Sequence, residues 1–243
     1  MKENKYDDGS FFKQYEKMTR SQKGLEGAGE WYVFKEMLPD LNGKKVLDLG
    51  CGYGWHCRHA IENGADSVIG VDISEKMLGK AKIINQLSGI KYQQIALEDT
   101  QFAAGRFDVI ISSLTFHYLQ SYDVLIGKIY RWLKLGGRLV FSVEHPVFTA
   151  QGKQNWIYNK SGNKMHWAVD RYFYEGRRNT SFLGAEVVKY HRTVSTYLNE
   201  LLNQGFKIID IKEPIPSETM LKNNPEMKDE LRRPMMLLIA VEK

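Results

Sequence analysis

The sequence has little cysteine and no long hydrophobic run. Its 243 residues include only two cysteines, Cys51 and Cys57. Two are too few for a disulfide framework and these are not spaced as a Cys-x-x-Cys metal site, so we expect free thiols. The longest apolar run near the end, residues 235–241, is far shorter than the roughly 20 residues that cross a bilayer. Residues 1–8 carry charges without a following apolar stretch, so we predict no signal peptide, a cytoplasmic location and no membrane association.

Positive and negative residues are interleaved along the chain, so no segment is strongly charged with one sign. The net charge of +5 and the pI of about 9.0 leave nucleic acid open as a partner without arguing for it. Basic residues concentrate only at Arg171, Arg177 and Arg178 and at Arg232 and Arg233, each time with acidic neighbours, which is typical of a solvated face. Hydrophobic residues make up 43% of the chain, enough to bury a large core in one domain, or in one domain with an insertion.

A glycine-rich stretch follows a short aliphatic run at residues 46–54, which read VLDLGCGYG. The run predicts a buried strand, and the alternating glycines Gly50, Gly52 and Gly54 predict a tight loop before a helix. Because glycine has no Cβ, such a loop reaches positive φ angles and lets a ligand lie against backbone N–H groups at a helix N-terminus. The sequence therefore predicts a site for a ligand with polar or anionic groups.

The spacing of these residues separates two kinds of nucleotide site. A dinucleotide fingerprint reads G-x-G-x-x-G, whereas this loop reads D-x-G-x-G-x-G from Asp48 to Gly54. A second acid, Asp72, ends the next predicted strand 22 residues after Gly50. In order and at this spacing, the two motifs resemble those of the class I S-adenosylmethionine (SAM)-dependent methyltransferases. The resemblance implies SAM as cofactor and a Rossmann-like α/β fold, in which a seven-stranded, mostly parallel sheet has helices on both faces.

The resemblance also assigns cofactor contacts. It places Asp72 on the ribose hydroxyls, Ile73 and Met77 on the adenine ring, and Arg20 on the SAM carboxylate. Met77 could instead be ordinary helix packing, and Arg20 an exposed loop residue. The full set of implied SAM contacts is Arg20, Asp48, Gly50, Cys51, Gly52, Gly54, Asp72, Ile73, Met77, Leu97, Glu98, Asp99, Ser112 and Ser113.

The predicted adenine loop departs from the usual pattern of that family. Many relatives carry an acid where this chain has Ala96. Glu98 or Asp99 is then expected to contact the adenine amino group, with Leu97 supplying backbone groups. The alternative is that both acids face solvent on a loop.

Strands and helices alternate over residues 41–144, which predicts the SAM-binding core with a parallel sheet. A helical cover precedes it at residues 1–40. The helix before the last core strand is expected to end at Gly136-Gly137, and that strand to span 138–144. Residues 145–190 are rich in aromatic side chains without a sustained period and are predicted to form an inserted substrate cap. A helix and a strand pair complete a single domain at residues 191–243.

Methyl transfer from SAM needs no metal and no catalytic triad, and the spacing of the histidines matches no metal-ligand signature. A base is needed only where the acceptor must lose a proton, and His117, His145 and His191 are the candidates. Each could instead be a hydrogen-bonding structural residue. Glu144 and His145 form a candidate oriented pair, although adjacent strand residues point to opposite faces.

The resulting hypothesis is an enzyme that transfers a methyl group from SAM to an O, N or C centre of a small molecule and releases S-adenosylhomocysteine. We expect a monomer or homodimer and have no reason from the sequence to expect a nucleic-acid partner. The alternatives are an RNA or protein methyltransferase and a non-catalytic SAM-binding protein. The glycine spacing disfavours a nicotinamide-dependent oxidoreductase.

Overall fold

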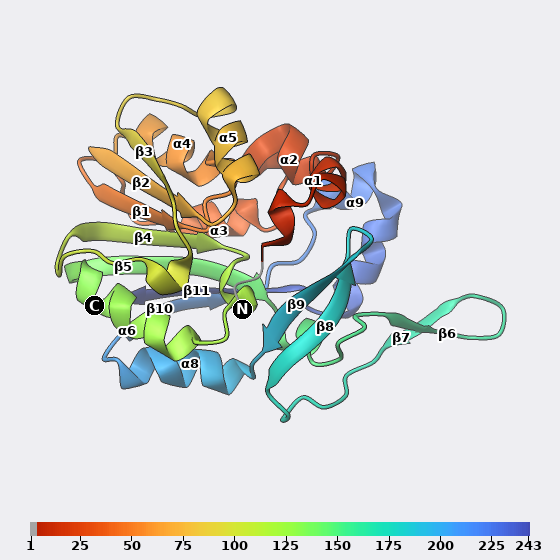
Figure 1. Cartoon of the computed structure of the whole chain (residues 1–243). Helices are drawn as coiled ribbons and strands as arrows, with labels where there is room; N and C mark the ends of the chain where they lie inside the picture. The colour runs from red at the N-terminus through yellow and green to blue at the C-terminus, as the bar shows by residue number, and fades with distance from the viewer. Residues whose placement is uncertain (1–3) are drawn as a thin grey trace.

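The computed structural model describes residues 4–243 and is built around one seven-stranded sheet (Figure 1). The strand order is β10-β11-β5-β4-β1-β2-β3. The strands are β1 (Lys45–Leu49), β2 (Ser67–Asp72), β3 (Ile90–Gln94), β4 (Phe107–Ser113), β5 (Leu133–Glu144), β10 (Lys207–Lys212) and β11 (Met236–Glu242). Strands β1 to β5 pair in parallel, while β11 runs antiparallel to both β5 and β10. The predicted Rossmann-like, mostly parallel sheet is thus confirmed.

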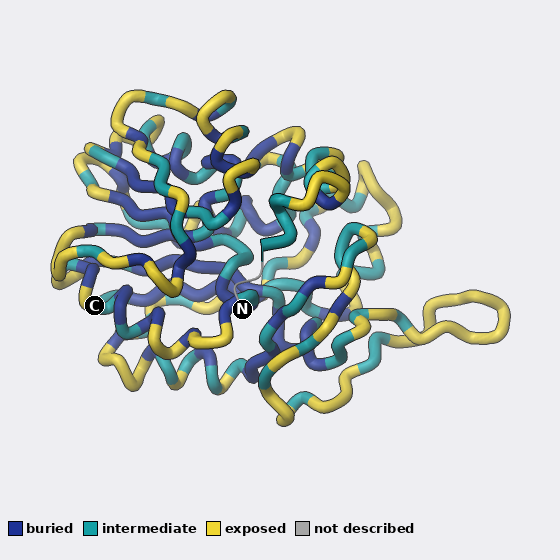
Figure 2. Tube along the Cα trace, in the orientation of Figure 1, coloured by how far each residue is buried: buried dark blue, intermediate teal, exposed yellow. Residues whose placement is uncertain are grey.

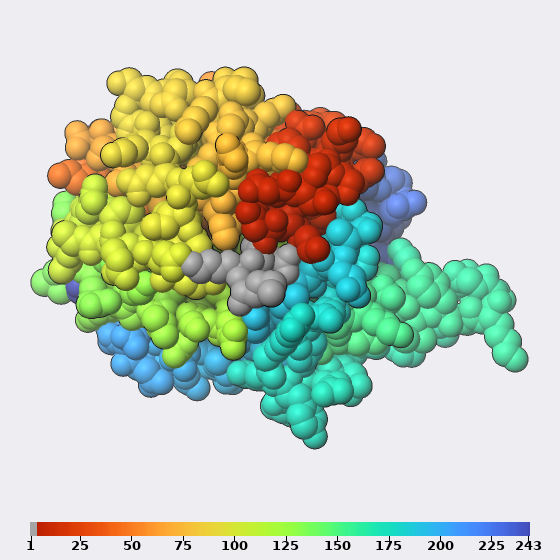
Figure 3. Space-filling view, in the orientation of Figure 1, coloured from red at the N-terminus to blue at the C-terminus, as the bar shows by residue number. Residues whose placement is uncertain are grey.

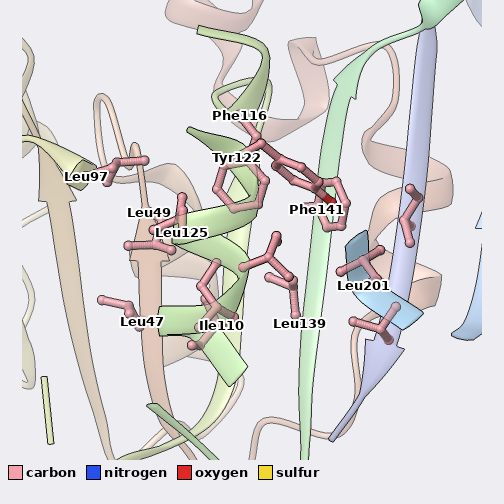
Figure 4. Packing of buried hydrophobic residues seen from close by; sticks show 14 of the residues in the cluster. Leu47, Leu49, Leu97, Ile110, Phe116, Tyr122, Leu125, Leu139, Phe141 and Leu201 are labelled. Atoms are coloured by element: carbon pink, nitrogen blue, oxygen red, sulfur yellow. The ribbon is translucent and has the colours of Figure 1, made fainter. Parts of the chain in front are cut away.

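Helices cover both faces of this sheet and create two apolar layers. On one face, α6 (Tyr122–Trp132) and α8 (Val194–Asn203) bury Leu125 and Leu201 against Leu139 of the sheet (Figure 4). On the other face lie α3 (Trp31–Met37), α4 (Trp55–Glu62) and α5 (Glu75–Ile84). The central strands are buried along almost their whole length, as Figure 2 shows, because helices exclude water from both sides.

Local signals placed most helix ends correctly. Ser74 caps α5, because its hydroxyl accepts a hydrogen bond from the Met77 N–H. Gly64 follows α4 with φ 85°, the left-handed conformation that ends many helices. The end of α6 was predicted wrongly: the helix stops at Trp132, and Gly136-Gly137 lie inside β5, which begins at Leu133. The pairing of β4 with β5 has an irregularity there, so the glycines bend a strand.

The inserted segment contains regular structure that its sequence did not reveal. After α7 (Pro146–Thr149) it forms two antiparallel hairpins, β6 (Trp156–Tyr158) with β7 (Lys164–Trp167) and β8 (Gly176–Phe182) with β9 (Ala185–His191). The β6–β7 hairpin projects from the body and is exposed at its tip (Figures 1 and 2). The turn of β8–β9 uses Leu183-Gly184, both at positive φ, and leucine is not a usual turn signal.

The N-terminal segment folds over the carboxyl end of the sheet. It comprises η1 (Lys5–Asp7), α1 (Gly9–Tyr15), α2 (Thr19–Lys23) and η2 (Gly24–Gly27). Asp7 fixes it to α5, because its carboxylate accepts hydrogen bonds from the Ser74 hydroxyl at 2.5 Å and the Lys76 N–H at 3.1 Å. Its Phe11 ring contacts Phe182 of β8, and Figure 3 shows this segment beside the β8–β9 hairpin.

The chain between β10 and β11 forms two short helical elements at the same end of the sheet. These are α9 (Glu218–Asn223) and η5 (Pro225–Arg232). Among residues 4–243, none of the helices is long and apolar enough to cross a membrane.

Asp48 is an ionisable group in the core of β1. It is 1% exposed, and the Cys57 thiol donates to its Oδ2 at 3.3 Å. Burial raises the pKa of Asp48 to about 7. Between the unfolded pKa near 4 and this folded value, the folded state holds more protons than the unfolded state, so stability falls as pH rises.

We predict that Asp48→Asn removes this pH dependence. Relative to the variant, the natural protein should lose about 3 kcal/mol of unfolding free energy between about pH 4.5 and about pH 8, since each pKa unit is worth roughly 1.4 kcal/mol. Denaturant titration of both proteins at the two pH values measures the difference. If the unfolding free energies of the two proteins changed with pH in the same way, Asp48 would not have the raised pKa that its burial implies.

Candidate functional site

A cavity of about 1040 Å³ opens at the carboxyl ends of β1, β2, β4 and β5. This is the edge where ligands of open α/β sheets bind. The N-terminal segment, the β8–β9 hairpin and the α9–η5 region supply the rest of its walls. Segments from both ends of the sequence and from the insertion therefore enclose one space.

The glycine loop forms the floor of this cavity next to β1. Gly50, Gly52 and Gly54 have φ angles of 75°, 52° and 76°, which side chains rarely allow. A Cβ on Gly50 would lie 2.2 Å from the Thr115 hydroxyl oxygen, so this position accepts only glycine. The Gly50 N–H donates to the Val71 carbonyl at 2.8 Å, which ties the loop to the end of β2.

Asp72 lies at the end of β2 and lines the cavity. Its carboxylate accepts hydrogen bonds from the Gly52 N–H and the Ser74 N–H, both at 2.9 Å. Burial raises the pKa of Asp72, while these two hydrogen bonds act in the opposite direction. Apolar side chains of Ile73, Met77 and Leu97 line the cavity nearby.

Arg20 and Glu30 bring a charged pair from the N-terminal cover to the same cavity. They form an ion pair, and the Ser113 hydroxyl donates to the same Glu30 oxygen at 3.3 Å. Burial alone would raise the pKa of Glu30, but the Arg20 charge and hydrogen bonds outweigh it and lower the pKa. The pair thus remains ionised at neutral pH.

These residues fit SAM, as the chemistry of the groups shows. A carboxylate at the end of β2 suits a ribose diol, the apolar side chains suit an adenine ring, and a guanidinium suits a carboxylate. The glycine loop brings the backbone of Gly50 and Gly52 to the cavity wall.

Nine of the predicted cofactor residues line this cavity, and five do not. Those that line it are Arg20, Gly50, Gly52, Asp72, Ile73, Met77, Leu97, Glu98 and Ser113. Those outside its lining are Asp48, Cys51, Gly54, Asp99 and Ser112.

Four of these five residues lie under or beside the loop, whereas Asp99 ends η3 (Leu97–Asp99), the short turn after β3. Ser112 precedes Ser113 on β4, so its side chain points to the other face and donates to the Leu49 carbonyl at 2.7 Å. Cys51 is buried, and a Cβ on Gly54 would meet the Tyr92 hydroxyl at 2.2 Å, so both mark the packing of the loop onto β2 and β3. Asp48 faces Cys57 in the core.

Only one of the three candidate histidines lines the cavity. His117 does so at 1% exposure, and its Nδ1 accepts a hydrogen bond from the Glu144 N–H at 3.3 Å. The neutral ring therefore carries its proton on Nε2. Burial lowers the pKa of His117 to about 4, so the ring is neutral at physiological pH.

The other two histidines have structural partners away from the cavity. His145 caps α7 through the Val147 N–H and lies 2.6 Å from a Glu213 carboxylate oxygen. His191 contacts the Thr149 hydroxyl and the Tyr172 carbonyl, each at 2.8 Å. Both ring nitrogens of His191 are thus engaged within the cap.

A buried polar network that the sequence did not predict joins the core to the cap. The Lys189 ammonium of β9 donates to Glu144 at 2.6 Å and to Gln154 at 3.3 Å. Burial would raise the pKa of Glu144, but His117, Lys189 and Gln154 together lower it. Glu144 ends β5 as Asp72 ends β2, so strand-end position could have identified it. Lys189 and Gln154 reach it only through the fold of the insertion.

Aromatic residues of the N-terminal cover were also missed. Tyr6 and Tyr15 line the cavity, and their rings pack edge to face with centroids 5.2 Å apart. The Tyr6 hydroxyl is hydrogen-bonded to that of Tyr118, and burial raises the pKa of Tyr6. No motif in the sequence signals the Tyr6–Tyr118 contact, because it joins residues more than 100 positions apart.

Comparison with known proteins agrees with this geometry. The sequence model of the methyltransferase domain family matches residues 47–141. A SAM-dependent methyltransferase from Mesorhizobium loti has 41% identity and a TM-score of 0.85, over 90% of this chain and 100% of that one. A structure from Listeria monocytogenes assigned to the same class has 52% identity and a TM-score of 0.83, over 88% and 98% of the two chains.

Relatives similar in sequence include methyltransferases named for different substrates. An uncharacterized protein of Haemophilus influenzae is 35% identical over 98% of this chain and 96% of its own length. Phosphoethanolamine N-methyltransferase 3 of Arabidopsis thaliana is 32% identical across 50% of this chain and 25% of its own length. Malonyl-[acyl-carrier protein] O-methyltransferase of Enterobacter lignolyticus is 31% identical over 49% of this chain and 46% of its own length. The chain belongs to the class I SAM-dependent methyltransferases, as the glycine loop, Asp72 and the full-length similarity to the Mesorhizobium loti and Listeria monocytogenes structures together show.

Proposed function

We propose that this methyltransferase acts on an O, N or C centre of a small molecule. The observation that carries the proposal is a single cavity with two differently built ends. The glycine loop and Asp72 line one end, whereas Phe148, Phe182 and Lys189 of residues 145–190 line the other. At about 1040 Å³, the cavity lies at the upper end of the roughly 300–1,000 Å³ range of small-molecule pockets, as expected of one that holds cofactor and acceptor together.

The acceptor end suits a largely apolar molecule with a polar group. Phe148, Phe182 and Val187 supply apolar wall, as do methionines of the α9–η5 region and β11. Lys189 and Glu144 are the charged groups at its inner side, and they neutralise each other. Residues 145–190 thus act as a substrate cap within a single domain.

The protein's task in the reaction is positioning. Bound SAM supplies an activated methyl group, so the chain must hold an acceptor atom in line and exclude water, which is worth roughly 7–11 kcal/mol. The Tyr6 and Tyr15 side chains and the β8–β9 hairpin cover the cavity. His117 is the one of the three candidate histidines that lines the cavity, and because its Nδ1 accepts the Glu144 N–H, its Nε2–H is the donor left to orient an acceptor oxygen or nitrogen.

One surface feature favours an RNA substrate as a second candidate. Arg171, Arg177 and Arg178 line a separate shallow pocket beside the exposed aromatic rings of Phe173 and Tyr174. Basic and stacking groups together suit single-stranded nucleic acid. However, Arg178 donates to the Ala150 and Tyr174 carbonyls and so holds the cap together. We therefore favour the small molecule.

Transfer of labelled methyl groups tests the choice of acceptor. Extract depleted of endogenous SAM is incubated with the protein and methyl-labelled SAM, and small molecules, RNA and protein are then separated. We expect the label in the small-molecule fraction. Label in RNA, with a yield that falls steeply with salt, would favour the second candidate. Binding of S-adenosylhomocysteine without transfer to any fraction would favour a non-catalytic SAM-binding protein.

We predict that Asp72→Asn weakens cofactor binding without unfolding the protein. The substitution removes the charge of the carboxylate that accepts the ribose hydrogen bonds. We expect the Kd for S-adenosylhomocysteine to rise about 10- to 100-fold, because charge-assisted hydrogen bonds contribute roughly 1.5–3 kcal/mol. Isothermal titration measures this, with NADH as a ligand control. Glu75→Gln, an exposed acid on the adjacent helix, is the matched control and should bind normally. Equal affinities for both variants would refute the ribose contact.

We predict that His117 stays neutral throughout the range in which the enzyme is assayed. Because burial lowers its pKa to about 4, its imidazole NMR signal should show no protonation step between about pH 8 and about pH 5.5. The signal is assigned by its absence in His117→Gln. A step near the ordinary histidine pKa would show that the ring is solvated and would contradict the buried, neutral imidazole.

A further inference from the structure

Glu30 is a buried acid on the wall of the cofactor end of the cavity. It immediately precedes α3 and is 2% exposed. The Ser113 hydroxyl, at the end of β4 beside the glycine loop, donates to its Oε1, and Arg20 pairs with the same atom. Glu30 is thus fixed near the loop. The cavity also has two acids of η5, Glu226 and Glu230, which belong to a different wall.

The second oxygen of Glu30 lacks a hydrogen bond. Within residues 4–243, no donor reaches Oε2, although that atom is buried. An unsatisfied buried acceptor costs roughly 1–3 kcal/mol, and more when it is charged. Since Arg20 keeps the carboxylate ionised, this oxygen calls for a positively charged N–H donor.

The cofactor carries such a donor at its amino-acid end. This end is a zwitterion, with an ammonium and a carboxylate on one carbon atom. Arg20 can donate further hydrogen bonds, since a guanidinium has five N–H groups and one of its nitrogens donates to Glu30. The Arg20–Glu30 pair therefore presents one charge of each sign, as recognition of a zwitterion requires.

We propose that Glu30 binds the α-ammonium group of the cofactor while Arg20 binds its carboxylate. This proposal rests on the cofactor site proposed above. The other acids near the glycine loop are less suited. Asp72 already accepts the Gly52 and Ser74 N–H groups, and Asp48 does not line the cavity. Both members of the pair belong to the N-terminal cover, so the amino-acid end of the cofactor also helps to hold this cover closed.

A binding cycle with two ligands and two proteins tests the role of Glu30. The ligands are S-adenosylhomocysteine and its desamino analogue, in which hydrogen replaces the amino group. The proteins are the natural chain and Glu30→Gln, both checked for folding by circular dichroism. We expect the natural protein to prefer S-adenosylhomocysteine about 10-fold or more, and Glu30→Gln to lose this preference, because a charge-assisted hydrogen bond is worth roughly 1.5–3 kcal/mol.

The cycle separates recognition from a merely structural ion pair. If Glu30 only anchors the cover, Glu30→Gln weakens both ligands by the same factor and the preference remains, which overturns the proposal. Unchanged affinities for both ligands overturn it as well. Glu36→Gln makes the same change at an exposed position of α3 and should keep the full preference. A folded natural protein that binds neither ligand would instead refute the cofactor site itself.

Discussion

The link between the glycine loop and the end of β2 is the constraint on which the site depends. Gly50 and Cys51 donate to the Val71 carbonyl, and Gly52 donates to the Asp72 carboxylate. Together these bonds set the loop against the neighbouring parallel strand and fix where the Asp72 carboxylate points. Thr115 closes in above Gly50 so tightly that no side chain fits there. The backbone of this loop is therefore already fixed in place where Gly50 and Gly52 line the cavity.

The parts of the fold that depend on local sequence were predictable. Buried strands β1, β2 and β4 have aliphatic runs, and helix ends follow caps such as Ser74. The cofactor end followed from the order of glycines and acids, which is also local. The β8–β9 hairpin was missed because it is mostly polar with a Leu-Gly turn, and α6 was extended too far because glycines can bend a strand as well as end a helix.

The missed parts of the site share a different cause. Lys189 reaches Glu144 across 45 residues, and Arg20 reaches Glu30 between two elements of the cover. Such pairs depend on how distant segments fold together, and neither residue type nor spacing indicates a partner. The histidines illustrate the same limit. Their chemistry makes them candidates for catalysis, but the fold places two of them outside the cavity lining. His145 contacts the Val147 N–H and the Glu213 carboxylate, and His191 contacts groups within the cap.

Charge pairing at the cavity explains how a protein with excess positive charge can bind a cation there. The cofactor sulfonium is positive, and the nearby cation Arg20 would repel it if it were alone. Glu30 neutralises Arg20, and Lys189 at the acceptor end is likewise neutralised by Glu144. Asp72 adds a further carboxylate to the lining of the cofactor end. The buried pairs thus supply directional hydrogen bonds without adding a field that opposes the sulfonium, which a lone arginine or lysine would do.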